Sequence, residues 1–169
     1  MIKLIAAVSS DGIIGTTNNE LPWIIAADLK RFKEKTMGGI LVVGRKTFES
    51  LNSRPLPGRE MAVITRNKRL VVNGVKFFTS LEDCITFYSS TKKTIWIAGG
   101  GTLYASAMPY VEEMLITKVH LEIGRGIYFP PINDTNWKVS DIELGGIEGN
   151  ITYDFITYQK INLDRNGKY

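Results

Sequence analysis

The chain has 169 residues, of which 44% are hydrophobic and 22% are charged, so its composition is that of a folded domain of ordinary size. The net charge of +4 and the pI near 9.1 come from cations spread along the chain, which does not favour a nucleic-acid-binding protein. No apolar run reaches the ~20 residues of a membrane span, and the N-terminus does not have a signal-peptide pattern. One cysteine and one histidine exclude an internal disulfide and a usual zinc site, so we expect no metal and a reducing, cytoplasmic location.

The first predicted element is an apolar run over residues 2–8, which indicates a buried strand of a sheet covered on both faces. A turn cluster at residues 9–12 and a polar loop at residues 16–20 follow. Leu-Pro-Trp at residues 21–23 then leads into a helix predicted over residues 25–37, which two glycines end.

Asp28 lies in the first turn of this predicted helix. The apolar residues 24–27 should partly desolvate its carboxyl group and raise its pKa, so that it could hold or relay a proton near neutral pH. An acid at this position also complements the helix dipole, and that structural interpretation stays open from this stretch alone. Leu29 and Phe32 lie three residues apart on one face of the helix.

A strand predicted over residues 40–43 runs directly into Gly-Arg-Lys-Thr at residues 44–47, which begin a helix ending near Leu51. Free backbone N–H groups, the positive end of a helix dipole and two cations would coincide there, which is typical of an anion site. A plain strand-to-helix turn is the alternative.

A third strand is predicted over residues 61–65 and is followed by the basic residues 66–69, at the edge of the sheet where ligand phosphates are expected. A solvated loop explains these cations equally well.

Residues 71–78 predict a weaker strand that contains a possible Asn-Gly turn. Ser80 is placed to cap a helix over residues 81–90, on which Cys84 would be a filler residue without activation.

A fourth strand, over residues 94–98, leads into three glycines at residues 99–101 and a short helix over residues 102–108. Glycines between a strand and a helix allow a ligand to approach the backbone closely, although a tight turn would also need them.

The C-terminal part predicts an antiparallel edge of the sheet. A strand with β-branched residues covers residues 114–123, and two alternating strands over residues 137–144 and 151–161 are joined by residues 145–150. Residues 162–169 are expected to form a frayed polar tail.

Over about residues 1–161, these motifs resemble, in order, the dihydrofolate reductase family. Each motif alone is weak, but the ordered set is specific. In chain order the motifs are Ile14-Gly15, Leu21-Pro22-Trp23, Asp28-Leu29 with Phe32, residues 44–47, the loop of residues 54–59, residues 99–101 with Tyr104, Thr117, and Tyr128-Phe129-Pro130.

The resemblance implies an α/β fold with three layers, in which a mostly parallel eight-stranded sheet with an antiparallel C-terminal hairpin edge carries about four helices on its two faces. It implies one catalytic domain over residues 1–169, with an adenosine-binding lobe at roughly residues 39–92. The implied reaction is NADPH-dependent reduction of 7,8-dihydrofolate to 5,6,7,8-tetrahydrofolate, by hydride transfer to C6 and protonation at N5. The product would supply one-carbon metabolism and thymidylate synthesis.

The resemblance also implies the residues of the site. As catalytic residues, Asp28 would hold the ring N–H and the amino group of the pterin, Thr117 would brace that contact, and Trp23 would lie beside the nicotinamide. Arg59 would bind the α-carboxylate of the substrate's glutamate. The other substrate-binding residues would be Ile5, Ala6, Ala7, Leu29, Phe32, Leu51 and Leu56. The cofactor-binding residues would be Ala7, Ile14, Gly15, Gly44, Arg45, Lys46, Thr47, Thr65, Arg66, Ala98, Gly99, Gly100, Gly101, Thr102, Leu103 and Tyr104, with a cis peptide bond between Gly99 and Gly100.

Residues 9–21 would form a mobile lid over the nicotinamide. Bacterial members of the family often carry an acid in a neighbouring loop that holds the lid closed, whereas this chain has Gly126 there, between Arg125 and Ile127. We therefore expect lid closure to be held differently or more weakly in this chain.

Two other functions remain open at this point. The related reductase of riboflavin synthesis shares the fold and NADPH, but it should lack the pairing of Asp28 with Arg59. A nucleotide-binding assembly component that has lost turnover is the second. The expected small-molecule partners are dihydrofolate and antifolates, without nucleic acid or a membrane; the expected state is a monomer, with a homodimer or an assembly role not excluded.

Overall fold

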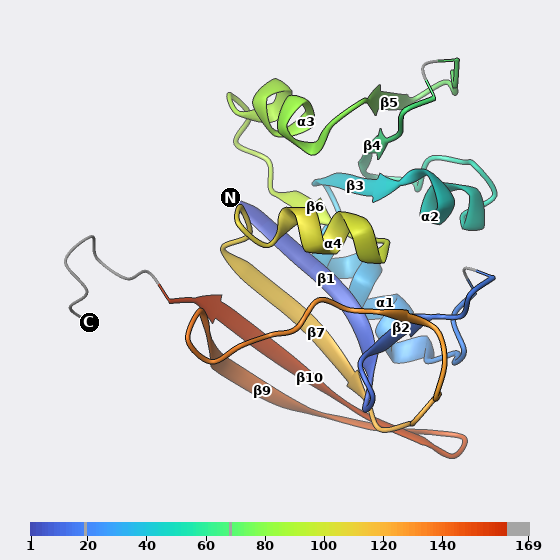
Figure 1. The fold of residues 1–169 in the computed structure, drawn as a ribbon, viewed down its shortest axis with the longest axis vertical. Helices are drawn as coiled ribbons and strands as arrows, with labels where there is room; N and C mark the ends of the chain where they lie inside the picture. Colours follow the sequence, from blue (N-terminus) through green and yellow to red (C-terminus); the bar gives the residue numbers. More distant parts are fainter. Residues whose placement is uncertain (19, 68, 162–169) are drawn as a thin grey trace.

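The computed structural model describes residues 1–18, 20–67 and 69–161, so the predicted polar tail lies outside the described residues (Figure 1). Within these ranges the main element is an eight-stranded sheet with the strand order β5-β4-β3-β6-β1-β7-β10-β9. Neighbouring strands pair in parallel except for β10, which runs antiparallel to both β7 and β9. The predicted mostly parallel sheet with an antiparallel C-terminal edge is confirmed.

The bounds of the elements agree with most of the predicted ranges to within one or two residues. The strands of the large sheet are β1 (Ile2–Ser9), β3 (Ile40–Gly44), β4 (Glu60–Ile64), β5 (Val75–Phe78), β6 (Ile95–Ile97), β7 (Glu113–Val119), β9 (Trp137–Glu148) and β10 (Ile151–Lys160). The helices are α1 (Ala26–Thr36), α2 (Arg45–Ser50), α3 (Leu81–Tyr88) and α4 (Gly101–Ala107). A separate small sheet pairs β2 (Ile13–Gly15) with β8 (Ile127–Tyr128).

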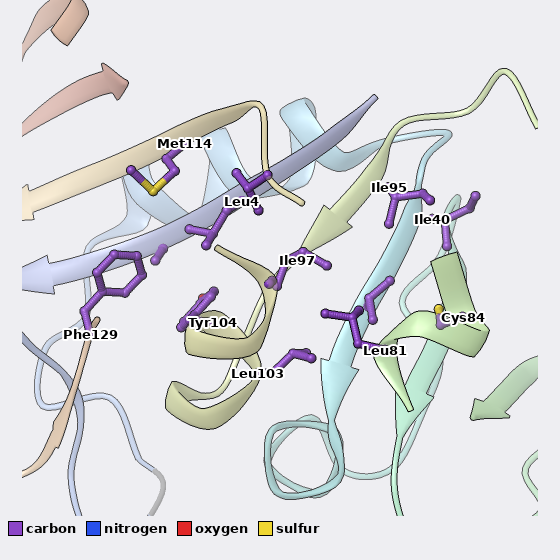
Figure 2. Close-up of a cluster of buried hydrophobic side chains, with 14 of the residues drawn as sticks. Leu4, Ile40, Leu81, Cys84, Ile95, Ile97, Leu103, Tyr104, Met114 and Phe129 are labelled. Atoms are coloured by element: carbon purple, nitrogen blue, oxygen red, sulfur yellow. The ribbon is translucent and has the colours of Figure 1, made fainter. Parts of the chain in front are cut away.

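The helices form layers on the two faces of the sheet, as predicted. Side chains of α3 and α4 pack on one face, where Leu81, Cys84 and Tyr104 belong to the same buried cluster as strand residues such as Ile97 (Figure 2). The opposite face carries α2, whose Phe48 is buried in a second cluster, and α1, whose Phe32 packs against that cluster. None of the helices in the described ranges is both long and apolar enough to cross a membrane.

The apolar runs of the central strands are explained by burial on both sides. In β3, Ile40 and Val42 belong to the cluster under α3 and α4, whereas Leu41 and Val43 belong to the cluster under α1 and α2. All four side chains are at most 1% exposed. A parallel strand covered on both faces needs apolar residues at consecutive positions, which is why these runs do not alternate.

Three strand predictions differ from the structure. β5 begins only at Val75 because Gly74, with φ +77°, forms the turn that the sequence indicated. β7 ends at Val119, four residues before the predicted end. β9 continues to Glu148, so Gly145 lies inside the strand, where a bulge shifts the register with β10 between Gly146 and Leu144. The predicted connection at residues 145–150 was therefore too long. Gly145 lies at the bulge inside β9, and the turn begins only after Glu148.

The predicted alternation of buried and exposed residues is wrong for β9. After Trp137, every described side chain of this strand is exposed or half-buried. Leu144 and Ile147, for example, are 84% and 71% exposed. β9 is the edge strand of the sheet, and no helix covers it, so the apolar positions of its pattern do not reach the core.

Candidate active site

A cavity of about 240 Å³ opens between α1 and the central strands, and it lies near the carboxyl ends of β3 and β6. The neighbours of β1 in the sheet are β6 and β7, which lie on opposite sides of it, so the strand order changes direction here. Ligands of open α/β sheets bind in the crevice at such a point, beyond the carboxyl ends of the strands. We call this cavity the first hollow.

Asp28 lines the first hollow from the first turn of α1, and the buried Thr117 of β7 contacts it from the sheet. The Thr117 hydroxyl donates a hydrogen bond of 2.5 Å to Oδ1 of Asp28. These residues are 89 positions apart in the sequence, so the pairing of β7 with β1 and the packing of α1 on the sheet bring them together. One carboxylate oxygen is thus fixed by the protein.

Burial raises the pKa of the Asp28 carboxyl group, as the sequence predicted. The hydrogen bond from Thr117 and the positive charge of Arg31 act in the opposite direction and lower the pKa, while the negative charge of Glu148 adds to the increase. Of the apolar residues 24–27 that the prediction relied on, Ile25 is 2% exposed but Ile24 points into solvent. The desolvation of the Asp28 carboxyl group therefore comes mainly from the residues that line the first hollow, and only in part from its neighbours in sequence.

The predicted substrate-binding residues divide into two groups. Ile5, Ala6, Ala7, Leu29, Phe32 and Leu51 line the first hollow. Leu56 lies outside this lining and packs against the cluster under α1 and α2. Trp23 is also outside the lining: it is 4% exposed in a cluster with Ile25, and its indole N–H has no hydrogen-bond partner among the described residues.

Arg59 lies at the outer side of α1. Its guanidinium group lies 5.9 Å from the ring centre of Phe32, which does line the hollow. Its Nη1 donates to Oγ1 of Thr36 at 3.3 Å, and its Nε donates to the carbonyl of Pro57 at 3.1 Å. Burial lowers the pKa of Arg59, yet a guanidinium group stays charged in proteins. A fixed cation therefore lies beside the end of the first hollow that Phe32 forms.

A larger second hollow, of about 770 Å³, lies at the carboxyl ends of β3 and β4 and continues from the first. Both hollows are lined by Thr47, Gly100, Gly101 and Ile127, so one elongated ligand could occupy them together. The predicted cofactor-binding residues all line one or both: Ala7, Ile14, Gly15, Ala98, Gly99 and Tyr104 the first, Gly44, Arg45, Lys46, Thr65, Arg66, Thr102 and Leu103 the second, and Thr47, Gly100 and Gly101 both.

The donors around the second hollow suit phosphate groups. Helices α2 and α4 begin at Arg45 and Gly101, and within the described residues neither start receives a side-chain cap. Their first N–H groups are therefore available to an anion, with the cations Lys46 and Arg66 in the same lining. A Cβ atom on Gly100 would lie 3.3 Å from Oγ1 of Thr47, so a larger residue would crowd Thr47 where the two hollows meet. The Gly99–Gly100 peptide bond is cis, as expected.

The predicted lid is attached to its neighbouring loop by backbone contacts. β2 pairs with β8, which places Gly15 opposite Ile127. The Asp11 carboxylate accepts hydrogen bonds from the N–H groups of Ile123 (3.0 Å) and Gly124 (2.7 Å). The acid of this contact, Asp11, therefore belongs to the predicted lid, and the loop around Gly126 supplies only backbone N–H groups. This is the reverse of the expected arrangement, in which the neighbouring loop carries the acid.

Sequence reasoning missed several residues of the site. Glu20, Leu21, Leu41, Val43, Ser50 and Ile127 also line the first hollow, and Asn67, Thr79, Ser80, Glu82 and Ser106 line the second. Position at the carboxyl end of a predicted strand could have indicated Val43, and the Leu-Pro-Trp motif and the stretch of residues 66–69 could have indicated Leu21 and Asn67.

Comparisons with known proteins agree with this geometry. The family model described as dihydrofolate reductase matches residues 1–160. A dihydrofolate reductase from Bacillus subtilis is 34% identical over 171 residues and covers 100% of both chains. One from Neisseria meningitidis serogroup A is 37% identical over 140 residues, which are 83% of this chain and 85% of the relative. A solved dihydrofolate reductase from Enterococcus faecalis, complexed with NADP(H) and RAB-propyl, superposes with a TM-score of 0.89 at 30% identity, covering 96% of this chain and 97% of that one.

The three-layer fold, with a half-buried acid in one hollow and cations beside two helix starts that no described side chain caps in the adjoining one, matches known reductases over nearly the whole chain, which defines a nucleotide-dependent oxidoreductase of the α/β class. The chain belongs to the dihydrofolate reductase family. It therefore reduces dihydrofolate with NADPH. Of the enzymes that the sequence left open, this favours dihydrofolate reductase over the related reductase of riboflavin synthesis.

Proposed function

We propose that Asp28 is the residue that recognises and polarises the pterin during dihydrofolate reduction. The observation that carries this proposal is its position: a carboxylate with a raised pKa, facing the first hollow, with one oxygen held by Thr117. Oδ1 keeps its orientation through that bond, and Oδ2 is left to accept from the pterin's ring N–H or amino group. A carboxylate held in this way favours charge development on the pterin and helps to place the proton at N5.

The remaining walls of the first hollow orient the substrate. Ile5, Leu29 and Phe32 present apolar surfaces that exclude water from the reacting face and pack against the pterin and benzoyl rings. The guanidinium of Arg59 next to Phe32 is placed to bind the substrate's α-carboxylate at the far end. Leu56 would act only through contact with the neighbouring cluster, since it lies outside the lining.

The second hollow would hold the adenosine and phosphate part of NADPH. The open starts of α2 and α4, with Lys46 nearby, would bind the pyrophosphate, and Arg45, Thr65 and Arg66 would bind the 2′-phosphate. When bound, NADPH supplies the hydride that is added to C6. Most of this lining comes from residues 44–82, which supports the adenosine-binding lobe at roughly residues 39–92 within a single catalytic domain.

The decisive experiment follows NADPH oxidation with dihydrofolate, comparing wild type with Asp28→Asn across pH. Wild type should turn over, and the variant should lose about 10²–10⁴-fold, the usual contribution of a proton-transfer group. The loss should be partly recovered at low pH, where N5 protonates without help. Equal rates for both proteins at neutral pH would contradict the role of Asp28.

Binding of an antifolate separates recognition from chemistry. Methotrexate should bind wild type much more tightly than Asp28→Asn, because the same carboxylate would hold its pteridine ring. Equal affinities would show that the pterin contact has been assigned to the wrong residue.

We also propose a cytoplasmic monomer. The single cysteine, Cys84, is buried, and burial raises its pKa to about 12, so it does not favour an intermolecular disulfide. Gel filtration at native concentration should give the mass of one 18.9 kDa chain. A mass twice as large would instead indicate a homodimer, for which the exposed apolar side chains of β9 offer a surface.

A further inference from the structure

The first turn of α1 is capped by a residue from the far end of the chain. Ile25, at the N-cap position, makes no side-chain hydrogen bond to the helix. Instead the N–H of Ala26 donates to Oε2 of Glu148 at 2.7 Å, and the N–H of Ala27 donates to Oε1 at 2.9 Å. Both carboxylate oxygens of Glu148 are therefore bonded to the two residues that directly precede Asp28.

Glu148 is well placed to keep this arrangement rigid. It is the last residue of β9, and it pairs with Ile151 across the short turn to β10. Tyr153, on β10, lies beside this carboxylate and also lowers its pKa. The hydrogen bonds from Ala27 and Ala26 lower the pKa of Glu148, so it is charged at neutral pH and complements the positive end of the helix dipole.

Two other helices next to the hollows have no such cap within the described ranges. The starts of α2 and α4 have no side-chain cap among the described residues and face the second hollow, where an anionic ligand can use them. The start of α1 is already occupied by a carboxylate, so it does not offer an anion site beside the pterin. Among the described residues, the starts of α2 and α4 are thus left uncapped, whereas those of α1 and α3 are capped by the side chains of Glu148 and Ser80.

We infer that Glu148 is a positioning residue for Asp28: its carboxylate, held on the β9–β10 hairpin, fixes the first turn of α1 and with it the orientation of the Asp28 carboxylate toward Thr117 and the first hollow. This inference rests on the proposed function, in which Asp28 holds the pterin. Glu148 itself does not line either hollow, so it acts through α1 and not by touching the substrate.

The charges around Asp28 determine what removal of Glu148 should do. From α1, Arg31 faces Asp28 with a positive charge, and Arg31 in turn faces Asp141 and Glu143 of β9. From β7 the Thr117 hydroxyl donates to Asp28, and Tyr104 and Tyr153 are neutral at physiological pH because the environment raises their pKa values. Burial is the main cause of the raised pKa of Asp28, and the negative charge of Glu148 adds to it, so loss of Glu148 should move the titration of Asp28 to lower pH.

The test compares Glu148→Ala and Glu148→Gln with the control Asp134→Asn. Asp134 is an exposed acid in the loop before β9, outside the charges around Asp28 named above. Glu148→Ala removes both acceptor oxygens. Glu148→Gln keeps one acceptor oxygen without the charge, so it should destabilise the fold less. We expect kcat to fall about tenfold in Glu148→Ala and less in Glu148→Gln, with KM for NADPH unchanged, since small displacements of a catalytic group have effects of this order.

Two further measurements separate positioning from simple destabilisation. The acidic limb of the pH–rate profile should move to lower pH in both Glu148 variants and stay in place in Asp134→Asn. Methotrexate should bind folded Glu148→Ala several-fold more weakly than wild type. If Glu148→Ala lost activity only in proportion to unfolded protein, with wild-type pH profile and methotrexate affinity, the inference would be wrong. Equal turnover of wild type and Asp28→Asn would instead overturn the proposed function on which this inference rests.

Discussion

Gly126 lies directly against the carbonyl oxygen of Gly15, and no side chain fits between the two backbones. A Cβ atom built on Gly126 would overlap that oxygen and would lie 2.7 Å from Cγ2 of Ile13. A carboxylate side chain at this position could not be accommodated without moving β2 away from β8. The predicted lid is instead held by the β2–β8 pairing and by the carboxylate of Asp11.

Gly126→Ala should therefore disturb the lid. We expect the free energy of unfolding to decrease by about 1–3 kcal/mol, the usual effect of an overpacked contact. The KM for NADPH should increase because Ile14 and Gly15, which line the first hollow, would be displaced. Denaturant unfolding and steady-state kinetics measure these effects. Arg125→Ala is the control, since this neighbour is exposed, and equal behaviour of both variants would contradict the steric argument.

Replacement of Asp28 should stabilise the fold while it removes activity. Because burial raises the pKa of Asp28 in the folded state, the folded protein binds the proton more tightly than the unfolded chain does. The associated stability is fully present below the ordinary pKa of 3.8 and is lost as the pH rises through the raised pKa. Asp28→Asn avoids this loss, so its Tm should exceed that of wild type at neutral pH, and the difference should disappear below pH 3.8. A lower Tm for the variant at neutral pH would refute this.

Thr117→Val removes the hydroxyl while it keeps the shape of the side chain. The hydrogen bond from Thr117 lowers the pKa of Asp28, so its removal should raise that pKa and shift the acidic limb of the pH–rate profile to higher pH. Turnover at neutral pH should fall about tenfold or more, since a hydrogen bond to a charged group contributes ~1.5–3 kcal/mol. Thr157→Val, a strand threonine on β10, should leave the profile unchanged.

Arg66→Ala should reduce the preference for NADPH over NADH. If Arg66 contacts the 2′-phosphate, its loss removes a charge-assisted hydrogen bond, and the KM for NADPH should increase roughly 10- to 100-fold. The KM for NADH, which has no such phosphate, should change little. Arg54→Ala, in an exposed loop outside both hollows, serves as the control for a change in overall charge.

Local patterns were sufficient to predict much of this molecule. The apolar runs of β1 and β3 predicted buried strands because both of their faces are covered, and Asp28 stood out because it is an acid in a first turn beside apolar residues. The environment of β9 could not be predicted, because its pattern does not reveal that no helix covers it. The roles of Gly126 and Glu148 depend on backbones that are distant in sequence, and nothing in their own neighbourhoods indicates those contacts.

The bond between Glu148 and the start of α1 joins the last hairpin of the chain to its first helix. Domains begin to form from the N-terminus while synthesis continues, so α1 is made long before its cap exists. A nascent chain, or one shortened before β9, would already contain Asp28, Thr117 and the linings of both hollows. It would nevertheless lack the Glu148 carboxylate, which caps the helix turn that carries Asp28. In this protein, the full catalytic rate would therefore be reached only once translation has passed Glu148, near the end of the fold.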